Sequence, residues 1–204
     1  VAYAWLGARR TGVMLVAGTH DRFLESALTA DRGLIAIPQT PEEYASWSAS
    51  PDWTPDVFVL NRVVPDPLPS GNLLILNPND ACALFDLTEE ANNLRVTTWR
   101  REHPVLAGAT LEDVFVSHAR PITPKMPAEV LAAAGDVPLL LAMESGGRRV
   151  VVLTFPPEKP SLTFRVAFPL LVANAIEWLT AGGGATLTTG TAGTDFRVAA
   201  GGVT

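Results

Sequence analysis

The chain has 204 residues, of which 48% are hydrophobic and 18% charged, with a formal net charge of −6 and a pI near 5.0. This composition is typical of a globular protein and too apolar for a disordered chain. The acidic balance, together with the absence of a lysine/arginine cluster, argues against a nucleic-acid-binding surface.

The single cysteine, Cys82, excludes an internal disulfide and any zinc site built from several cysteines. No uninterrupted apolar run approaches the roughly 18 residues of a transmembrane helix, so we expect no direct membrane insertion of this stretch. The sequence starts without Met or a basic leader, and we expect it to be part of a longer chain.

Apolar runs alternating with helical patterns predict an α/β fold. Seven runs predict strands, at residues 12–18, 34–39, 56–63, 72–77, 112–122, 137–145 and 148–155. Four segments predict helices, at residues 19–33 (capped by Asp21), 41–47, 127–135 and 162–182. The continuous apolar runs are typical of parallel strands buried on both faces, and Gly146-Gly147 predicts a hairpin that adds an antiparallel portion. Together these patterns predict a three-layer sandwich around a mostly parallel sheet.

The two ends of the chain differ from this pattern. Residues 1–9 are rich in Ala, residues 183–204 are rich in Thr, Ala and Gly, and both segments are strand-like. We therefore predict three parts: a flanking strand of a neighbouring β domain at 1–9, the α/β domain at 10–182, and further flanking strands at 183–204.

Four segments carry a resemblance to a known group of proteins: residues 2–28, 56–78, 102–108 and 138–179. Their order resembles large bacterial membrane proteins that combine an aerotolerance-regulator region, a von Willebrand factor A domain and a class I glutamine-amidotransferase-like domain. The resemblance implies a flavodoxin-like, amidotransferase-like domain within a membrane-anchored parent protein, with the side of the membrane left open.

Class I amidotransferases place a cysteine on a tight strand-to-helix turn and follow a later strand with Phe-His-Pro-Glu. Here that string reads Phe155-Pro156-Pro157-Glu158, so proline occupies the histidine position and Glu158 has no imidazole to orient. Cys82 lies a few residues beyond the strand at 72–77, with no glycine close to it. We interpret residues 81–84 as a packed helical turn and Cys82 as a small apolar side chain.

The three histidines offer no obvious replacement base. His103 precedes a proline in a loop, His118 follows an apolar run, and His20 lies with Asp21 at the first strand-to-helix turn, where α/β sheets bind ligands. His20 and Asp21 are therefore ligand-edge candidates. No two histidines have metal-ligand spacing on one helix, and no phosphate-binding glycine motif is present, so we expect no metal and no cofactor.

The sequence thus leaves two readings of function open. The first is a non-catalytic scaffold or interaction module of a cell-envelope protein, whose partners are other domains of the same parent chain or envelope proteins. The alternative is a cysteine hydrolase or amidotransferase that uses Cys82 with a recruited histidine, His118 or His103. An imidazole within hydrogen-bond reach of the Cys82 sulfur would favour the second.

Overall fold

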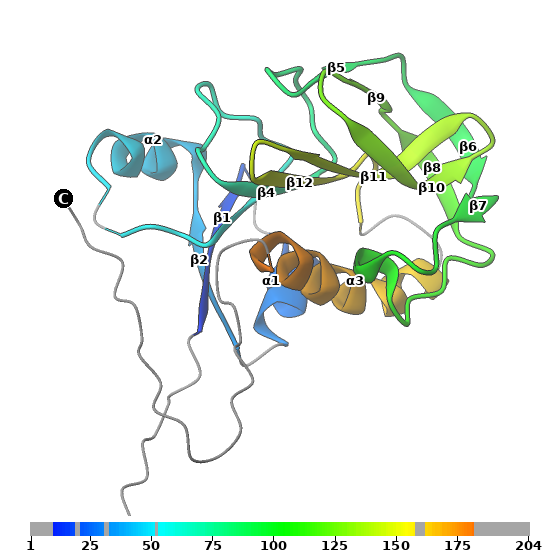
Figure 1. The fold of residues 1–204 in the computed structure, drawn as a ribbon, viewed down its shortest axis with the longest axis horizontal. Helices are drawn as coiled ribbons and strands as arrows, with labels where there is room; N and C mark the ends of the chain where they lie inside the picture. Colours follow the sequence, from blue (N-terminus) through cyan, green and yellow to red (C-terminus); the bar gives the residue numbers. More distant parts are fainter. Residues whose placement is uncertain (1–9, 19–20, 31–32, 52, 158–161, 182–204) are drawn as a thin grey trace, which may run out of the picture.

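The fold of the chain is seen in a computed structural model that describes residues 10–18, 21–30, 33–51, 53–157 and 162–181 (Figure 1). The predicted flanking strands at 1–9 and 183–204 lie outside these residues, and so do His20 and Glu158. Within the described residues, no helix is long and apolar enough to cross a membrane.

An eight-stranded mixed sheet forms the centre of the fold (Figure 1). In spatial order its strands are β2 (Leu34–Gln39), β1 (Thr11–Ala17), β3 (Val57–Asn61), β4 (Asn72–Leu76), β12 (Arg148–Leu153), β11 (Val137–Ser145), β10 (Ala128–Ala134) and β7 (Thr98–Trp99). Pairings from β2 to β12 are parallel, and those from β12 to β7 are antiparallel. The predicted α/β class with a mostly parallel sheet is confirmed.

In the described part of the chain, three α-helices cover the two faces of this sheet: α1 (Arg22–Thr29), α2 (Pro41–Ala49) and α3 (Leu162–Thr180). Figure 1 shows α1 and α3 on one face and α2 on the other. The predicted cap of α1 is confirmed, because the Asp21 carboxylate accepts from the backbone N–H groups of Phe23 and Leu24, each at 3.1 Å. The helix α2 begins with a capping box between Thr40 and Glu43.

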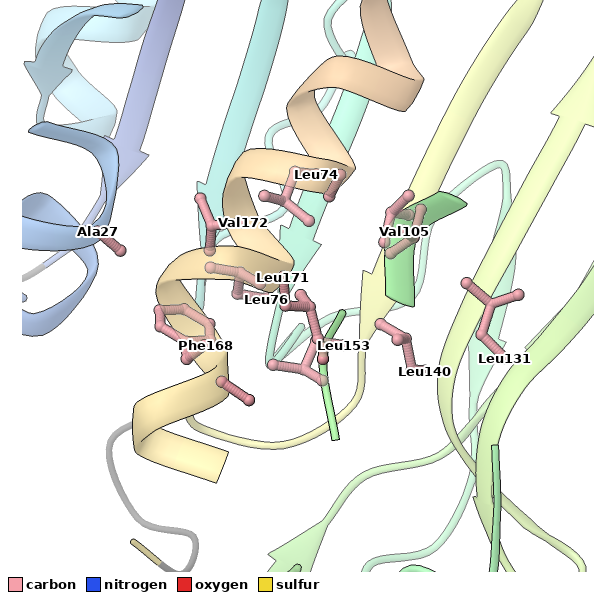
Figure 2. Packing of buried hydrophobic residues seen from close by; sticks show 14 of the residues in the cluster. Ala27, Leu74, Leu76, Val105, Leu131, Leu140, Leu153, Phe168, Leu171 and Val172 are labelled. Carbon is pink, nitrogen blue, oxygen red and sulfur yellow. The ribbon is translucent and has the colours of Figure 1, made fainter. Parts of the chain in front are cut away.

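The larger core lies between the sheet and the helices α1 and α3 (Figure 2). Helix α3 presents to it the predicted face, whose members are all buried: Phe168, Leu171, Val172, Ala175, Ile176 and Leu179. Alternate residues of the central strands meet this face, including Leu74, Leu76 and Leu153. The alternation explains why the strands read as continuous apolar runs, since their other side chains enter a second core.

The second core lies on the face that α2 covers. Only Tyr44 of α2 is buried there, so loops supply much of the cover. The segment after β4 crosses this face and leads into β5 (Phe85–Leu87), which pairs with β9 (Ile122–Pro124). The position that a helix takes in a regular three-layer fold is filled here by Leu84, Phe85 and Ile122.

The predicted helix at 127–135 is wrong, because this segment forms β10. It pairs with β11 through a two-residue turn at Gly135 and Asp136, and Gly135 has φ +59°. Alanine has the highest helix propensity, but tertiary packing overrides propensity, and here the hairpin buries Leu131 and Ala132 against the first core. The predicted hairpin at Gly146-Gly147 is confirmed, with φ of +60° and +81°, as a type I′ turn requires.

The chain between β5 and β10 adds small elements on the sheet's antiparallel side. Strand β6 (Ala91–Arg95) pairs with β8 (Phe115–Ala119). A short 3₁₀ helix, η1 (Pro104–Leu106), packs against α3. These elements matter for function because they carry His103, at the N-cap of η1, and His118, in β8.

Candidate functional site

Strand β4 ends in a tight turn at Asn77, whose φ of +47° lies in the left-handed region. Asparagine enters this region more readily than most residues with a β-carbon. The backbone N–H of Asn77 donates to the carbonyl of Leu153 at 2.7 Å and ties the turn to the end of β12. The next residue, Pro78, has no backbone N–H. An asparagine followed by a proline therefore occupies the turn that directly follows β4.

The neighbouring strand β12 ends in the segment that resembles Phe-His-Pro-Glu. Thr154 is fully buried, and its hydroxyl lies 3.2 Å from the carbonyls of both Pro138 and Leu139. Phe155 and Pro156 are also buried. Because Leu76 and Leu153 are register partners in adjacent parallel strands, the turns after β4 and β12 leave the same edge of the sheet side by side. The turn at Asn77 and the segment that resembles Phe-His-Pro-Glu are thus adjacent at one edge of the sheet.

Cys82 lies in a loop, and the predicted helical turn at 81–84 is wrong. The Cys82 N–H donates forward to the carbonyl of Phe85 at 3.0 Å, whereas a helical N–H bonds to a carbonyl four residues earlier. Pairing of β5 with β9 draws the segment into this extended path. The thiol is half-buried against the second core, and its Sγ accepts from the Leu84 N–H at 3.4 Å.

Arg148 is the charged side chain whose pKa responds to Cys82. Arg148, at the start of β12, donates to the carbonyls of Gly71 and Pro69. Its pKa is lowered by burial and raised by the nearby Cys82 thiol.

His118 lies at the carboxyl edge of the sheet, next to the turn after β4. It lines a cavity of about 210 Å³ together with Asn77, Pro78, Asn79, Glu90 and Arg120. Its Nδ1 is 3.1 Å from the Ser117 hydroxyl oxygen. The structure thus brings His118 to the turn that follows β4, but without Cys82, which does not line this cavity.

His103 lies on the other face of the sheet from Cys82. Its Nδ1 accepts from the Val105 N–H at 3.2 Å, and its ring centroid lies 5.4 Å from that of Trp178 in α3. Burial lowers the pKa of His103, Glu129 raises it and Arg100 lowers it further. Among the described residues, no imidazole lies within hydrogen-bond reach of the Cys82 sulfur.

Acid is expected to destabilise the protein through His103. Its folded-state pKa is below the 6.5 of a free histidine, so the unfolded chain binds more protons as pH falls through about 6.5 and below. His103→Asn keeps a side-chain acceptor for the cap and removes the titration. Urea unfolding at pH 7 and pH 5 should show a larger loss of stability in the wild type than in His103→Asn. Equal losses, or a smaller one in the wild type, would contradict this assignment.

Of the two ligand-edge candidates at the first turn, His20 lies outside the described residues. Asp21 caps α1, and its Oδ2 accepts from the Asn61 amide at 3.2 Å. Near this turn, a cavity of about 290 Å³ opens at the carboxyl ends of β1 and β2 and includes Glu25 and Glu43. No group of three potential metal-ligating side chains occurs in the part of the chain that the structure describes.

Solved structures share this fold at low sequence identity. The cytoplasmic protein STM1381 from Salmonella typhimurium LT2 aligns over 83% of this chain and 99% of its own, with 12% identity and a TM-score of 0.62. A ThuA-like protein from Bacteroides uniformis ATCC 8492 aligns over 87% and 94%, with 11% identity and a TM-score of 0.58. A GMP synthase candidate from Thermoplasma acidophilum aligns over 83% and 96%, with 12% identity and a TM-score of 0.55.

These similarities show that the chain has an amidotransferase-like, ThuA-like fold, and at such identities they show the fold alone. No protein-family model matches the chain, and no curated protein sequence does. Function must therefore be argued from the site itself.

Proposed function

We propose that the domain is a non-catalytic amidotransferase-like module. The observation that carries the proposal is the occupancy of the two adjacent strand ends: Asn77 and Pro78 follow β4, and Pro156 follows β12. In the amidotransferases that the sequence resembles, these places hold the nucleophile and the base. Among the described residues, neither of these strand ends carries a nucleophile or a titratable base.

Each of the residues at these strand ends lacks a separate property that acyl transfer requires. An asparagine amide at position 77 is not a nucleophile of the kind that covalent catalysis uses. In the elbow geometry, the N–H of the residue after the nucleophile helps to stabilise the oxyanion, and Pro78 has none. Pro156 has no titratable nitrogen with which to accept a proton. A single replacement would therefore not rebuild the reaction.

The alternative, a hydrolase that uses Cys82, finds less support in the geometry. A thiolate nucleophile needs a base in hydrogen-bond reach. His118 lines the cavity at the carboxyl edge, and His103 packs on the opposite face from Cys82. The thiol instead accepts a backbone N–H within its own loop.

The role that remains for such a module is interaction within a larger protein. The resemblance favours a membrane-anchored parent of the aerotolerance-regulator and von Willebrand factor A type, in which other domains of the same chain are the partners.

Helix α3 carries exposed apolar side chains one turn apart, Val166 at 73% and Leu170 at 42% exposure. Residues 183–204, expected to be strands of a neighbouring β domain, come shortly after this helix in the sequence. We propose that this neighbouring domain covers Val166 and Leu170.

The proposed contact can be tested by thiol accessibility in the longer parent chain. In a Cys82→Ala background, a cysteine introduced by Val166→Cys should react slowly with a thiol reagent. Glu177→Cys, on an exposed polar position of the same helix, is the matched control and should react fast. Equal rates at the two positions would show that nothing covers Val166.

The absence of catalysis can be tested directly on the wild-type protein. Ammonia release from glutamine and hydrolysis of an activated ester should not differ between the wild type and Cys82→Ala. A rate that depends on Cys82 would overturn the non-catalytic assignment and favour the hydrolase.

A further inference from the structure

The cavity at the carboxyl ends of β4 and β12 has the position of a ligand site. In open α/β sheets, ligands bind in the crevice outside the carboxyl ends of the strands. Asn77 and Pro78 form one wall directly after β4, and Arg120 forms another. The backbone N–H of Arg120 donates to the carbonyl of Thr154 at 2.9 Å, which fixes this wall to the end of β12. The cavity is therefore built on the ends of two central strands.

The polar side chains that line this cavity have unused hydrogen-bonding capacity within the described part of the chain. The Asn77 amide makes no side-chain hydrogen bond there, and His118 engages only Nδ1, with Ser117. The Arg120 guanidinium has five donors and uses one, in a long bond of 3.3 Å to the Asn79 carbonyl. All three side chains are half-buried. Such groups lose part of their hydration without gaining protein partners, so a ligand that pairs with them recovers that energy.

The charges around the cavity select the kind of ligand. Arg120 has a permanent positive charge and a planar fork that matches a carboxylate. In the tautomer in which Nδ1 accepts from the Ser117 hydroxyl, the Nε2 of His118 donates. Glu90, exposed at the rim, repels multiply charged anions and accepts a hydrogen bond from a hydroxyl group. The volume of about 210 Å³ is below that of most drug-sized ligand pockets.

We propose that this cavity binds a small hydroxy-monocarboxylate, with the carboxylate on Arg120 and His118 and the hydroxyl directed to Glu90. Asn77 supplies a further donor and acceptor from the turn after β4. The proposal goes beyond the non-catalytic role and does not depend on it, because it concerns binding and involves no bond cleavage. A failure of binding and a discovery of turnover are therefore distinguishable results.

Titration followed by the NMR signals of His118 and Asn77 tests the site. The probes are lactate and glycerate, with propionate as the analogue that lacks a hydroxyl and inorganic phosphate as a multiply charged anion. We expect saturable shifts with the hydroxy acids at about millimolar concentration, weaker binding of propionate and the weakest of phosphate. Phosphate binding as tight as that of glycerate, or no saturable shift with any hydroxy acid, would overturn the proposal.

Variants then assign the contacts. Arg120→Gln should weaken hydroxy-acid binding by about tenfold or more, which corresponds to roughly 1.4 kcal/mol. Glu90→Gln should reduce the advantage of lactate over propionate. Arg95→Gln, which removes an exposed arginine paired with Asp113 elsewhere, should leave binding unchanged.

If Arg120→Gln fails to fold, Asn77→Asp serves instead, because aspartate tolerates the left-handed turn and places a negative charge in the cavity. Unchanged affinity in the folded variant would overturn the proposal.

Discussion

Leu171→Ala is expected to lower the free energy of unfolding by about 2–5 kcal/mol, the range for truncation of a fully buried leucine. Leu171 is 0% exposed and lies between α3 and the strands β4 and β12, near Leu76 and Leu153 (Figure 2). The rigid sheet on one side and the helix backbone on the other limit how far the surroundings can collapse into the space left behind. The loss therefore includes both the transfer of the side chain and the cavity.

The preceding residue on the same helix provides the matched control. Leu170 is 42% exposed, so Leu170→Ala removes the same atoms with a much smaller loss of buried surface. Urea unfolding should show a large decrease for Leu171→Ala and a small one for Leu170→Ala. In a thermal melt, the former corresponds to a decrease in Tm of about 4–20 °C. Similar values for the two variants would mean that α3 does not pack on the sheet in this orientation.

Asn77→Val is expected to destabilise the domain by about 1–3 kcal/mol through the backbone alone. The φ of +47° at Asn77 is costly for a β-branched side chain, which crowds the carbonyl in the left-handed region. Asn77→Gly removes that crowding and should be close to the wild type, because glycine adopts this conformation freely. The two substitutions therefore separate backbone conformation from the loss of the amide.

Asn79→Val is the control for Asn77→Val. Asn79 is exposed in the same loop and is not among the residues with positive φ. Urea unfolding of the three variants should rank Asn77→Val below both Asn77→Gly and Asn79→Val. Equal stability of the two valine variants would show that the turn after β4 differs from the one described, and with it the position of the strand end that defines the site.

The fold can be predicted from the sequence where burial leaves a continuous or periodic apolar pattern. The strand at 56–63 reads as one apolar run because Val57 and Val59 enter one core while Phe58 and Leu60 enter the other. The long final helix shows its buried face in the same way. Asp21 is recognisable as a helix cap because a side-chain acceptor before an amphipathic segment is a local signal.

The antiparallel part is harder to predict because its signals are weak or non-local. Residues 127–135 are rich in alanine around a short apolar run, a composition that favours helix by propensity alone. The Gly135-Asp136 pair is the available signal, since a Gly-Asp step between two apolar runs is typical of a hairpin. The extended path at Cys82 depends on the pairing of β5 with β9, which lies far along the chain and leaves no local trace near the cysteine.

The candidate site can be predicted only in part. The sequence itself shows that Pro156 replaces the expected histidine. It also shows Asn77-Pro78 directly after an apolar strand, but the importance of that pair becomes clear only when the end of β4 is known. The approach of His118 and Arg120 to Asn77 depends on the pairing of β6 with β8 and on the bond from Arg120 to Thr154. Contacts of this kind between distant segments have no sequence pattern of their own.

Repair of one strand end by Pro156→His tests the proposed non-catalytic role. Pro156→His restores the string Phe-His-Pro-Glu with Glu158 behind it. Ammonia release from glutamine should be measured side by side for the wild type, Pro156→His and Pro156→His combined with Cys82→Ala. We expect the same background rate in all three, because Cys82 does not line the cavity beside Asn77 and Pro78 offers no oxyanion donor. Ammonia release in Pro156→His that disappears with Cys82→Ala would contradict it.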